Sequence, residues 1–221
     1  MNAQPCVLLN GWPGVGKDTV AETLSLLIGD NKTSLLDWDK AQGGSFQPLP
    51  YGEEEVRKAR DECFAEQVEH PSTLDKMVIC TDCISDTPEG RKLARDFEIV
   101  ADRSKRLLIP INLECHVEEN MRRLQEAERR VSMKEKKQVP LTIARIEAVQ
   151  SPMEARTVRF EGGKLFVFKQ RQGLTINITR MPPHEAALQI LSFIRDLIAR
   201  LDHELSTEET TPLEAKELAW A

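Results

Sequence analysis

The sequence predicts an α/β protein in which a parallel sheet is covered by helices on both faces. Short apolar runs alternate along the chain with longer amphipathic segments, which is the pattern of parallel sheets built from strand–helix–strand units. The chain has 221 residues, 40% of them hydrophobic, so it is long and apolar enough for one domain with its own core.

Five apolar runs have the length and composition of buried strands. They cover residues 6–9, 33–37, 76–81, 107–113 and 174–178. The fourth run contains Pro110, which is unusual inside a strand because proline has no backbone N–H to donate.

Five segments between or after these runs are predicted to be helices, from their apolar spacing and their end signals. They cover residues 17–28, 53–69, 87–106, 117 to about 131, and 183–201. The last has the clearest apolar stripe. Alternating residues around Gly162 and Gly163 predict a β-hairpin insertion at about 157–169, before the final strand. Residues 203–221 are expected to form an acidic C-terminal tail.

The overall charge and the termini limit the class of protein. The net charge of −6 gives no general field that would attract nucleic acid. No stretch approaches the roughly 18 apolar residues of a membrane span, and the N-terminus has no signal-peptide pattern, so we expect a cytoplasmic protein without membrane contact. Five cysteines without regular spacing are consistent with reduced thiols in that compartment.

The stretch after the first strand predicts a phosphate-binding loop. Residues 11–17, GWPGVGK, match G-x-x-x-x-G-K. Glycines let several backbone N–H groups point at one anion, and the following helix adds the positive end of its dipole. The lysine reaches the β- and γ-phosphates. We therefore expect ATP to be held by Gly11, Pro13, Gly14, Val15, Gly16 and Lys17.

Asp18 occupies the position where this motif normally has Ser or Thr, whose hydroxyl binds Mg²⁺. A carboxylate oxygen is itself a ligand of the type that Mg²⁺ prefers, and Thr19 offers a hydroxyl one residue later. Both are candidate nucleotide and metal contacts. Without a metal, Asp18 would repel phosphate, so a nucleotide-dependent switch with little turnover stays open as an alternative.

Three stretches together resemble a known group of proteins. NGWPGVGKDTVA (10–21), LLD (35–37) and TDCISDTPE (81–89) are similar to small P-loop kinases of the shikimate- and nucleotide-kinase type, and to small AAA-type P-loop proteins of microbes and fungi. The resemblance implies a three-layer αβα P-loop NTPase fold with a five-stranded parallel sheet and a lid helix after strand four. The kinase-like domain would cover residues 1–202, with its lid at about 117–150.

Carboxylates follow the second and third predicted strands, where ligands of open α/β sheets bind. LLDWDK resembles the D-x-D of shikimate-kinase-type enzymes, which implies that Asp39, and then Asp37, orients or deprotonates the acceptor hydroxyl. MVICTD resembles a strand whose final Asp82 holds Mg²⁺ through water. The alternative for each is a turn or capping carboxylate that bonds its own backbone. Asp86 is expected to be the N-cap of the next helix.

A run of basic residues follows the fourth predicted strand. In the resembling kinases, arginines of the lid clamp the nucleotide, because the planar guanidinium grips phosphate oxygens in pairs. The resemblance implies that Arg122 lies over the base or phosphates and that Arg129 and Arg130 close from the lid. The alternative is a solvated helix with i,i+4 ion pairs such as Glu126–Arg130.

These expectations lead to one function and several alternatives. The leading one is an ATP- and Mg²⁺-dependent phosphotransferase that moves the γ-phosphoryl group to a small-molecule acceptor, at a hydroxyl. A nucleoside or nucleotide kinase is the nearest alternative, and the nucleotide-binding switch is a second. The basic run also suggests a kinase of oligonucleotide ends, against which the acidity of the whole chain argues.

Overall fold

One five-stranded, all-parallel sheet organises the chain, in the order β2-β3-β1-β4-β5. The computed structural model describes residues 3–36, 53–123, 126 and 163–209. The strands are β1 (Cys6–Gly11), β2 (Thr33–Leu36), β3 (Met77–Asp82), β4 (Leu108–Glu114) and β5 (Leu174–Asn177). The longer α-helices are α1 (Lys17–Ile28), α3 (Glu53–Phe64), α4 (Pro88–Arg103) and α8 (Pro183–Glu209).

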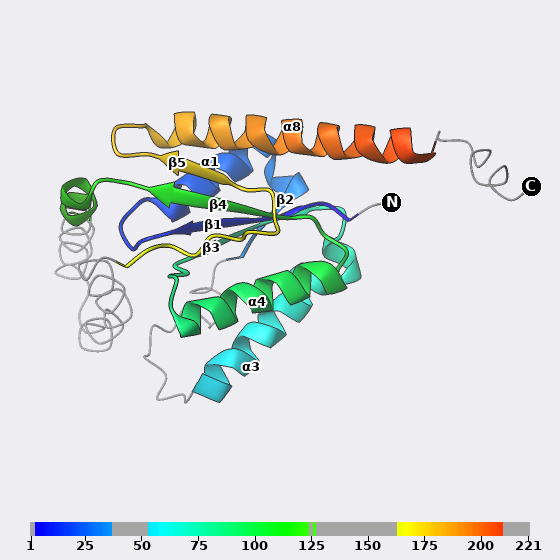
Figure 1. Cartoon of the computed structure of the whole chain (residues 1–221), viewed down its shortest axis with the longest axis horizontal. Helices are drawn as coiled ribbons and strands as arrows, with labels where there is room; N and C mark the ends of the chain where they lie inside the picture. The colour runs from blue at the N-terminus through cyan, green and yellow to red at the C-terminus, as the bar shows by residue number, and fades with distance from the viewer. Residues whose placement is uncertain (1–2, 37–52, 124–125, 127–162, 210–221) are drawn as a thin grey trace, which may run out of the picture.

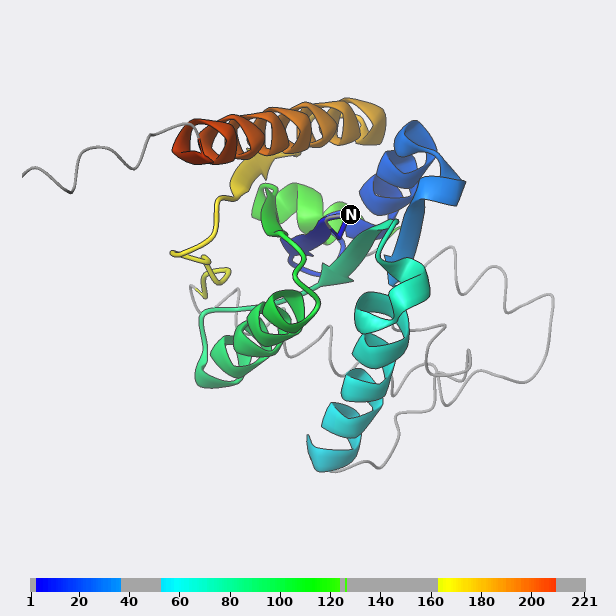
Figure 2. The ribbon, with the colours of Figure 1, turned by 90° about the vertical axis from the view of Figure 1, so that its right-hand side faces the viewer.

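The helices form a layer on each face of the sheet. Helices α1 and α8 lie on one face, and α3 and α4 lie on the other, as Figures 1 and 2 show from two directions. The predicted three-layer αβα fold with a five-stranded parallel sheet is thereby confirmed. A parallel sheet needs this double cover because both of its faces are apolar.

Side chains of β1 alternate between two hydrophobic cores. Val7 and Leu9 belong to the core under α1 and α8, whereas Cys6 and Leu8 belong to the core under α3 and α4. This is the period of two that a strand imposes on its side chains. Each fully buried leucine contributes about 1.5–3 kcal/mol of hydrophobic stabilisation, so both cores hold β1, and with it the loop that follows, in place.

The predicted elements agree closely with the observed ones. All five strands are present within two residues of the expected bounds, and α1 has the expected bounds. Strand β4 accommodates Pro110 where its pairing with β5 has not yet begun, since that pairing starts at Ile111. The helix predicted at 53–69 ends its α-helical part at Phe64 and continues as a π-helical turn, Ala65–Glu69.

Three boundaries differ from expectation, and the first is the end of α4, at Arg103 and not at the predicted residue 106. Thr87, and not Asp86, is the N-cap of α4: its hydroxyl accepts a hydrogen bond from the Gly90 N–H at 3.1 Å. Asp86 instead pairs with Arg91 at 2.8 Å. Helix α8 continues to Glu209, so residues 203–209 of the predicted tail are helical. Their polar sequence has strong helix formers but no apolar stripe, and the stripe was the basis of the prediction.

The predicted hairpin lies partly outside the described residues, which begin again at Gly163. The part that is described pairs with the loop after β3. Leu165 forms an antiparallel bridge with Ser85, the Asp86 N–H donates to the Lys164 carbonyl at 2.7 Å, and the Phe166 N–H donates to the Ile84 carbonyl at 2.9 Å. We call residues 164–168 the strap.

Two further expectations concern the environment of the protein. All five cysteines are free thiols, as their irregular spacing predicted. Within the parts of the chain that the structure describes, none of the helices combines the length and apolar character needed to cross a membrane.

Candidate functional site

The loop between β1 and α1 needs its glycines. Gly14 (φ 78°) and Gly16 (φ 106°) lie in the left-handed region, which residues with a side chain rarely adopt. At Gly11 the constraint is space: an added Cβ would lie 2.9 Å from both the Leu113 carbonyl oxygen and Val15 Cγ1. The three glycines therefore allow the tight curl of this loop, within which the Val15 N–H donates to the Trp12 carbonyl at 3.1 Å.

Lys17 lies over this loop. Its ammonium donates hydrogen bonds to the carbonyls of Gly11 at 2.9 Å and Trp12 at 3.4 Å. Helix α1 starts at Lys17, and its N-cap, Gly16, has no side chain to occupy the first helical N–H groups. A cation, the glycine loop and the positive end of a helix dipole thus share one place, a combination that favours an anion.

The predicted metal residues lie beside this place. Asp18 and Thr19 are exposed in the first turn of α1. Asp82 ends β3, where it is registered with Asn10 of β1, and one of its oxygens accepts the Cys83 N–H at 2.7 Å. Burial raises the pKa of Asp82, and the charges of Arg60 and Lys17 act in the opposite direction. Lys17 and Asp82 therefore share one edge of the sheet and influence each other electrostatically.

A short helical segment, residues 117–123, supports the phosphate loop from the side of β4. Asn120 is buried, and its side-chain N–H donates to the Pro13 carbonyl at 2.7 Å. One turn further, Arg123 Nη1 donates to the Val15 carbonyl at 2.7 Å. Both contacts fix the backbone of the loop without using the N–H groups that would bind phosphate.

Arg123 also holds the connection between β5 and α8. Its Nη2 donates to the carbonyls of Ile178 and Thr179, both at 3.0 Å, and its Nε donates to Glu119 at 2.8 Å. From the sequence, a nucleotide contact is expected at the neighbouring Arg122, and Arg123 is not among the predicted site residues. The signal that was available is the spacing of Glu119, Asn120 and Arg123, which lie three and four residues apart and so share one helical face.

Arg122 lies on the outer side of the same segment. It pairs with Glu119 at 2.7 and 2.8 Å and with Glu126, and its side chain is 55% exposed. Hydrogen bonds from Arg122 and Arg123 lower the pKa of Glu119 to about 2. Glu119 therefore stays ionised and orients both guanidinium groups.

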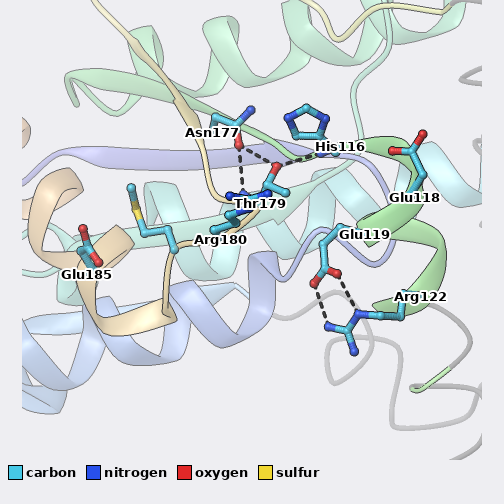
Figure 3. Close-up of a pocket in the computed structure, with 9 residues that line it drawn as sticks. His116, Glu118, Glu119, Arg122, Asn177, Thr179, Arg180 and Glu185 are labelled. Carbon is cyan, nitrogen blue, oxygen red and sulfur yellow. Dashed lines mark hydrogen bonds and ion pairs between the residues drawn. The ribbon is translucent and has the colours of Figure 1, made fainter.

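A cavity of about 910 Å³ lies between the segment after β4 and the β5–α8 connection, and Arg123 connects one of its lining residues, Thr179, to Val15 of the phosphate loop. Figure 3 shows the side chains around it. One wall of the cavity follows β4 and the other includes the end of β5. Thr179 connects them, because its hydroxyl accepts the His116 N–H at 2.9 Å and donates to Asn177 Oδ1 at 2.7 Å. The cavity is lined by His116, Glu118, Glu119, Arg122, Asn177, Thr179, Arg180, Met181 and Glu185. Its volume is within the range of small-molecule and cofactor sites.

Four predicted site residues, Asp37, Asp39, Arg129 and Arg130, lie outside the described residues. Their roles as acceptor-orienting carboxylates and lid arginines stay predictions. The remaining predicted site residues lie in one region of the structure. The loop and its surroundings contain Lys17, Asp18, Thr19 and Asp82, and the neighbouring cavity is lined in part by Arg122.

A glycine loop and lysine between the first strand and helix of an all-parallel sheet define a P-loop NTPase with the fold of the small kinases. The chain belongs to the AAA domain family, whose model matches residues 7–142. No curated protein sequence matches the chain.

Several solved structures share the fold. A putative kinase from Chloroflexus aurantiacus has a TM-score of 0.57 at 14% identity, covering 89% of this chain and 98% of that one. A sugar kinase from Janibacter sp. has a TM-score of 0.52 at 14% identity, covering 87% and 95%. APS kinase from Mycobacterium tuberculosis, solved with AMPPNP and APS, has a TM-score of 0.52 at 15% identity, covering 88% and 99%. At such identities these likenesses show the fold.

Proposed function

We propose that this protein is an ATP-dependent phosphotransferase that moves the γ-phosphoryl group of ATP to a small-molecule acceptor, at a hydroxyl. The observation that carries the proposal is the glycine loop with Lys17 over it, which Arg123 connects to the cavity by bonding Val15 of the loop and the cavity-lining Thr179. The triphosphate would bind the loop N–H groups and Lys17, and the base would enter the cavity. The kinases of the same fold support this class of reaction.

The oxygen ligands beside the loop fit Mg²⁺. Asp18, Thr19 and Asp82 supply carboxylate and hydroxyl oxygens, which are the ligands that Mg²⁺ prefers, and the burial of Asp82 would favour a bound cation beside its carboxylate. When bound, Mg²⁺ neutralises charge on the β- and γ-phosphates. Lys17 would stabilise the charge that develops on the transferred group, and Arg122 would reach the nucleotide from the cavity wall. Asp39 and Asp37 would orient the acceptor.

The exposed Asp18 supports a second candidate, a nucleotide-binding switch with little turnover. A carboxylate in the first turn of α1 competes with phosphate for the same helix dipole. The two candidates differ in one measurable property, because a kinase forms ADP rapidly only when its acceptor is present. A screen of sugars, nucleosides and other hydroxyl compounds for stimulated ADP release separates them.

Thermal unfolding with 1 mM ATP and Mg²⁺ tests nucleotide binding directly. For a dissociation constant of about 10 μM, the native protein should gain about 2.7 kcal/mol, which raises its midpoint by about 5–10 °C at this size. Lys17→Met, which keeps an unbranched side chain of similar length, should lose the rise. Lys32→Met, at an exposed site beyond the end of α1, should keep it. No rise for the native protein with any nucleotide contradicts the proposal.

A further inference from the structure

Two buried asparagines lie directly beneath the phosphate loop, and the proposed chemistry does not use them. Asn10 of β1 is 0% exposed and Asn112 of β4 is 7% exposed. They are registered partners on adjacent strands, and Asn10 Nδ2 donates to Asn112 Oδ1 at 3.1 Å. A buried amide costs free energy unless its hydrogen bonds are satisfied. Other inward positions of these strands are apolar, so a polar pair here needs a physical reason.

Asn10 uses its side chain as a short extension of β1. The Ile84 N–H donates to Asn10 Oδ1 at 2.7 Å, and Asn10 Nδ2 donates to the Ile84 carbonyl at 3.1 Å. Backbone pairing between β1 and β3 ends at Asn10 and Asp82. The amide group therefore binds the backbone of Ile84 as a further strand residue would. It fixes the chain two residues beyond the candidate metal ligand Asp82.

Asn112 connects the same amides to the strap. Its Nδ2 donates to the Phe166 carbonyl at 3.2 Å, and the Phe166 N–H donates to the Ile84 carbonyl at 2.9 Å. Asn10, Ile84, Phe166 and Asn112 thus form a closed ring of hydrogen bonds. We call it the amide ring.

The strap is held on the α4 side of the sheet as well as by the ring. Phe168 is buried in the core under α3 and α4 and packs edge to face with Phe166. Figure 1 shows this part of the chain, in yellow, running along the sheet toward β5. The amide ring is therefore the polar connection between the strap, the loop after β3 and the residue that precedes Gly11.

We propose that Asn10 and Asn112 are positioning residues for the phosphate site: through the amide ring they lock the loop 82–86 and the strap to the phosphate loop. This role rests on the proposed function. Buried, mutually satisfied hydrogen bonds resist displacement because a broken one leaves an unpaired polar group in a medium of low dielectric constant. Binding of phosphate at the loop should therefore stabilise the strap, which is not itself part of that loop.

Hydrogen exchange of the ligand-free protein tests the lock itself. Asn112→Leu keeps the size of the side chain and removes its donor and acceptor. We expect the Ile84 and Phe166 N–H groups to exchange about tenfold faster or more, relative to the Val78 N–H, which bonds Pro5 away from the ring. Thr33→Val is the matched control, because it removes a buried hydroxyl pair with Ser25 (2.6 Å) at the amino end of β2. Thr33→Val should leave the exchange rates of the Ile84 and Phe166 N–H groups unchanged.

Exchange with Mg²⁺ and AMPPNP tests the connection to the phosphate site. In the native protein and in Thr33→Val, AMPPNP should slow exchange of the Phe166 N–H. In Asn112→Leu, AMPPNP should bind more weakly, and even at a saturating concentration it should not slow that exchange. A purely structural role of Asn112 would lower stability and leave this response to AMPPNP intact. Should Asn112→Leu fail to fold, Asn112→Ser replaces it, because its hydroxyl is too short to reach both partners.

The outcomes separate the two proposals. Equal exchange of Ile84 and Phe166 in the native protein and Asn112→Leu overturns the positioning role, even where AMPPNP binds. Slowed exchange of Phe166 in Asn112→Leu on AMPPNP binding overturns it too. Absence of AMPPNP binding by the native protein overturns the proposed function, while faster exchange of Ile84 and Phe166 in ligand-free Asn112→Leu would still support the lock.

Discussion

Arg123 donates a hydrogen bond to the backbone carbonyl of Val15 at 2.7 Å, which fixes the helical segment after β4 directly to the phosphate loop. The same guanidinium bonds two carbonyls of the β5–α8 connection. One side chain therefore sets the distance between the loop and the neighbouring cavity, and several expectations depend on it.

Arg123→Met should destabilise the protein more than Arg122→Met. Arg123 is largely buried, and its removal leaves three backbone carbonyls without that donor, which should lower the free energy of unfolding by about 2–3 kcal/mol. Arg122 makes exposed ion pairs that solvent screens, so its loss should lower the free energy of unfolding much less. Urea denaturation at pH 7 measures both. Equal losses would show that the contacts of Arg123 contribute little to stability.

Gly16→Ala and Gly29→Ala form a matched pair that separates backbone strain from function. Both glycines have similar left-handed φ values, 106° and 110°, so each alanine should lower stability by about 1–3 kcal/mol. Gly16 belongs to the phosphate loop, whereas Gly29 ends α1. Only Gly16→Ala should lose the rise in unfolding midpoint on addition of Mg²⁺ and ATP. Loss of that rise in Gly29→Ala as well would point to global destabilisation.

Glu119 should make stability depend on acid pH. Its folded-state pKa of about 2 lies below the ordinary value of 4.5, so its contribution is present above pH 4.5 and is lost as pH falls toward 2. The native protein should therefore lose more unfolding free energy between pH 6 and pH 3 than Glu119→Gln does. Denaturation curves at both pH values measure the difference. Parallel losses would contradict a role for this carboxylate in the arginine pairs.

Asp82→Asn should affect stability and nucleotide binding in opposite directions. Burial raises the pKa of Asp82, which means that the ionised carboxylate costs folding free energy at pH 7. The neutral amide avoids that cost, and its oxygen can still accept the Cys83 N–H. We expect a higher unfolding midpoint without ligand and a smaller rise with Mg²⁺ and ATP, as at many functional sites. Thermal unfolding with ATP, with and without Mg²⁺, measures both effects, and an unchanged rise contradicts a metal role.

The elements of the fold follow from local patterns. Apolar runs of four to seven residues predicted the strands, and the glycines and Lys17 predicted the phosphate loop, because periodicity and turn chemistry act between residues close in sequence. The last two turns of α8, residues 203–209, are not predicted by such patterns, because their mainly polar sequence lacks the apolar stripe by which a helix is recognised.

The candidate site was predictable where it is built from one continuous stretch. Lys17, Asp18 and Thr19 follow the loop in sequence and lie beside it in space. Arg123 was not predictable in the same way, because neighbouring positions on a helix differ by about 100° in direction. Only the packing of the segment 117–123 against the loop shows that Arg123 faces inward and Arg122 faces the cavity.

The sequence by itself therefore determined the class of fold, the order of its elements and the phosphate loop, since each depends on contacts within a few residues. The tertiary structure decided which distant side chains serve that loop. Asn10 and Asn112 are 102 residues apart, and Asn10 and Ile84 are 74 apart. Their hydrogen bonds exist because parallel pairing brings β1, β3 and β4 side by side, a long-range arrangement that no local pattern specifies.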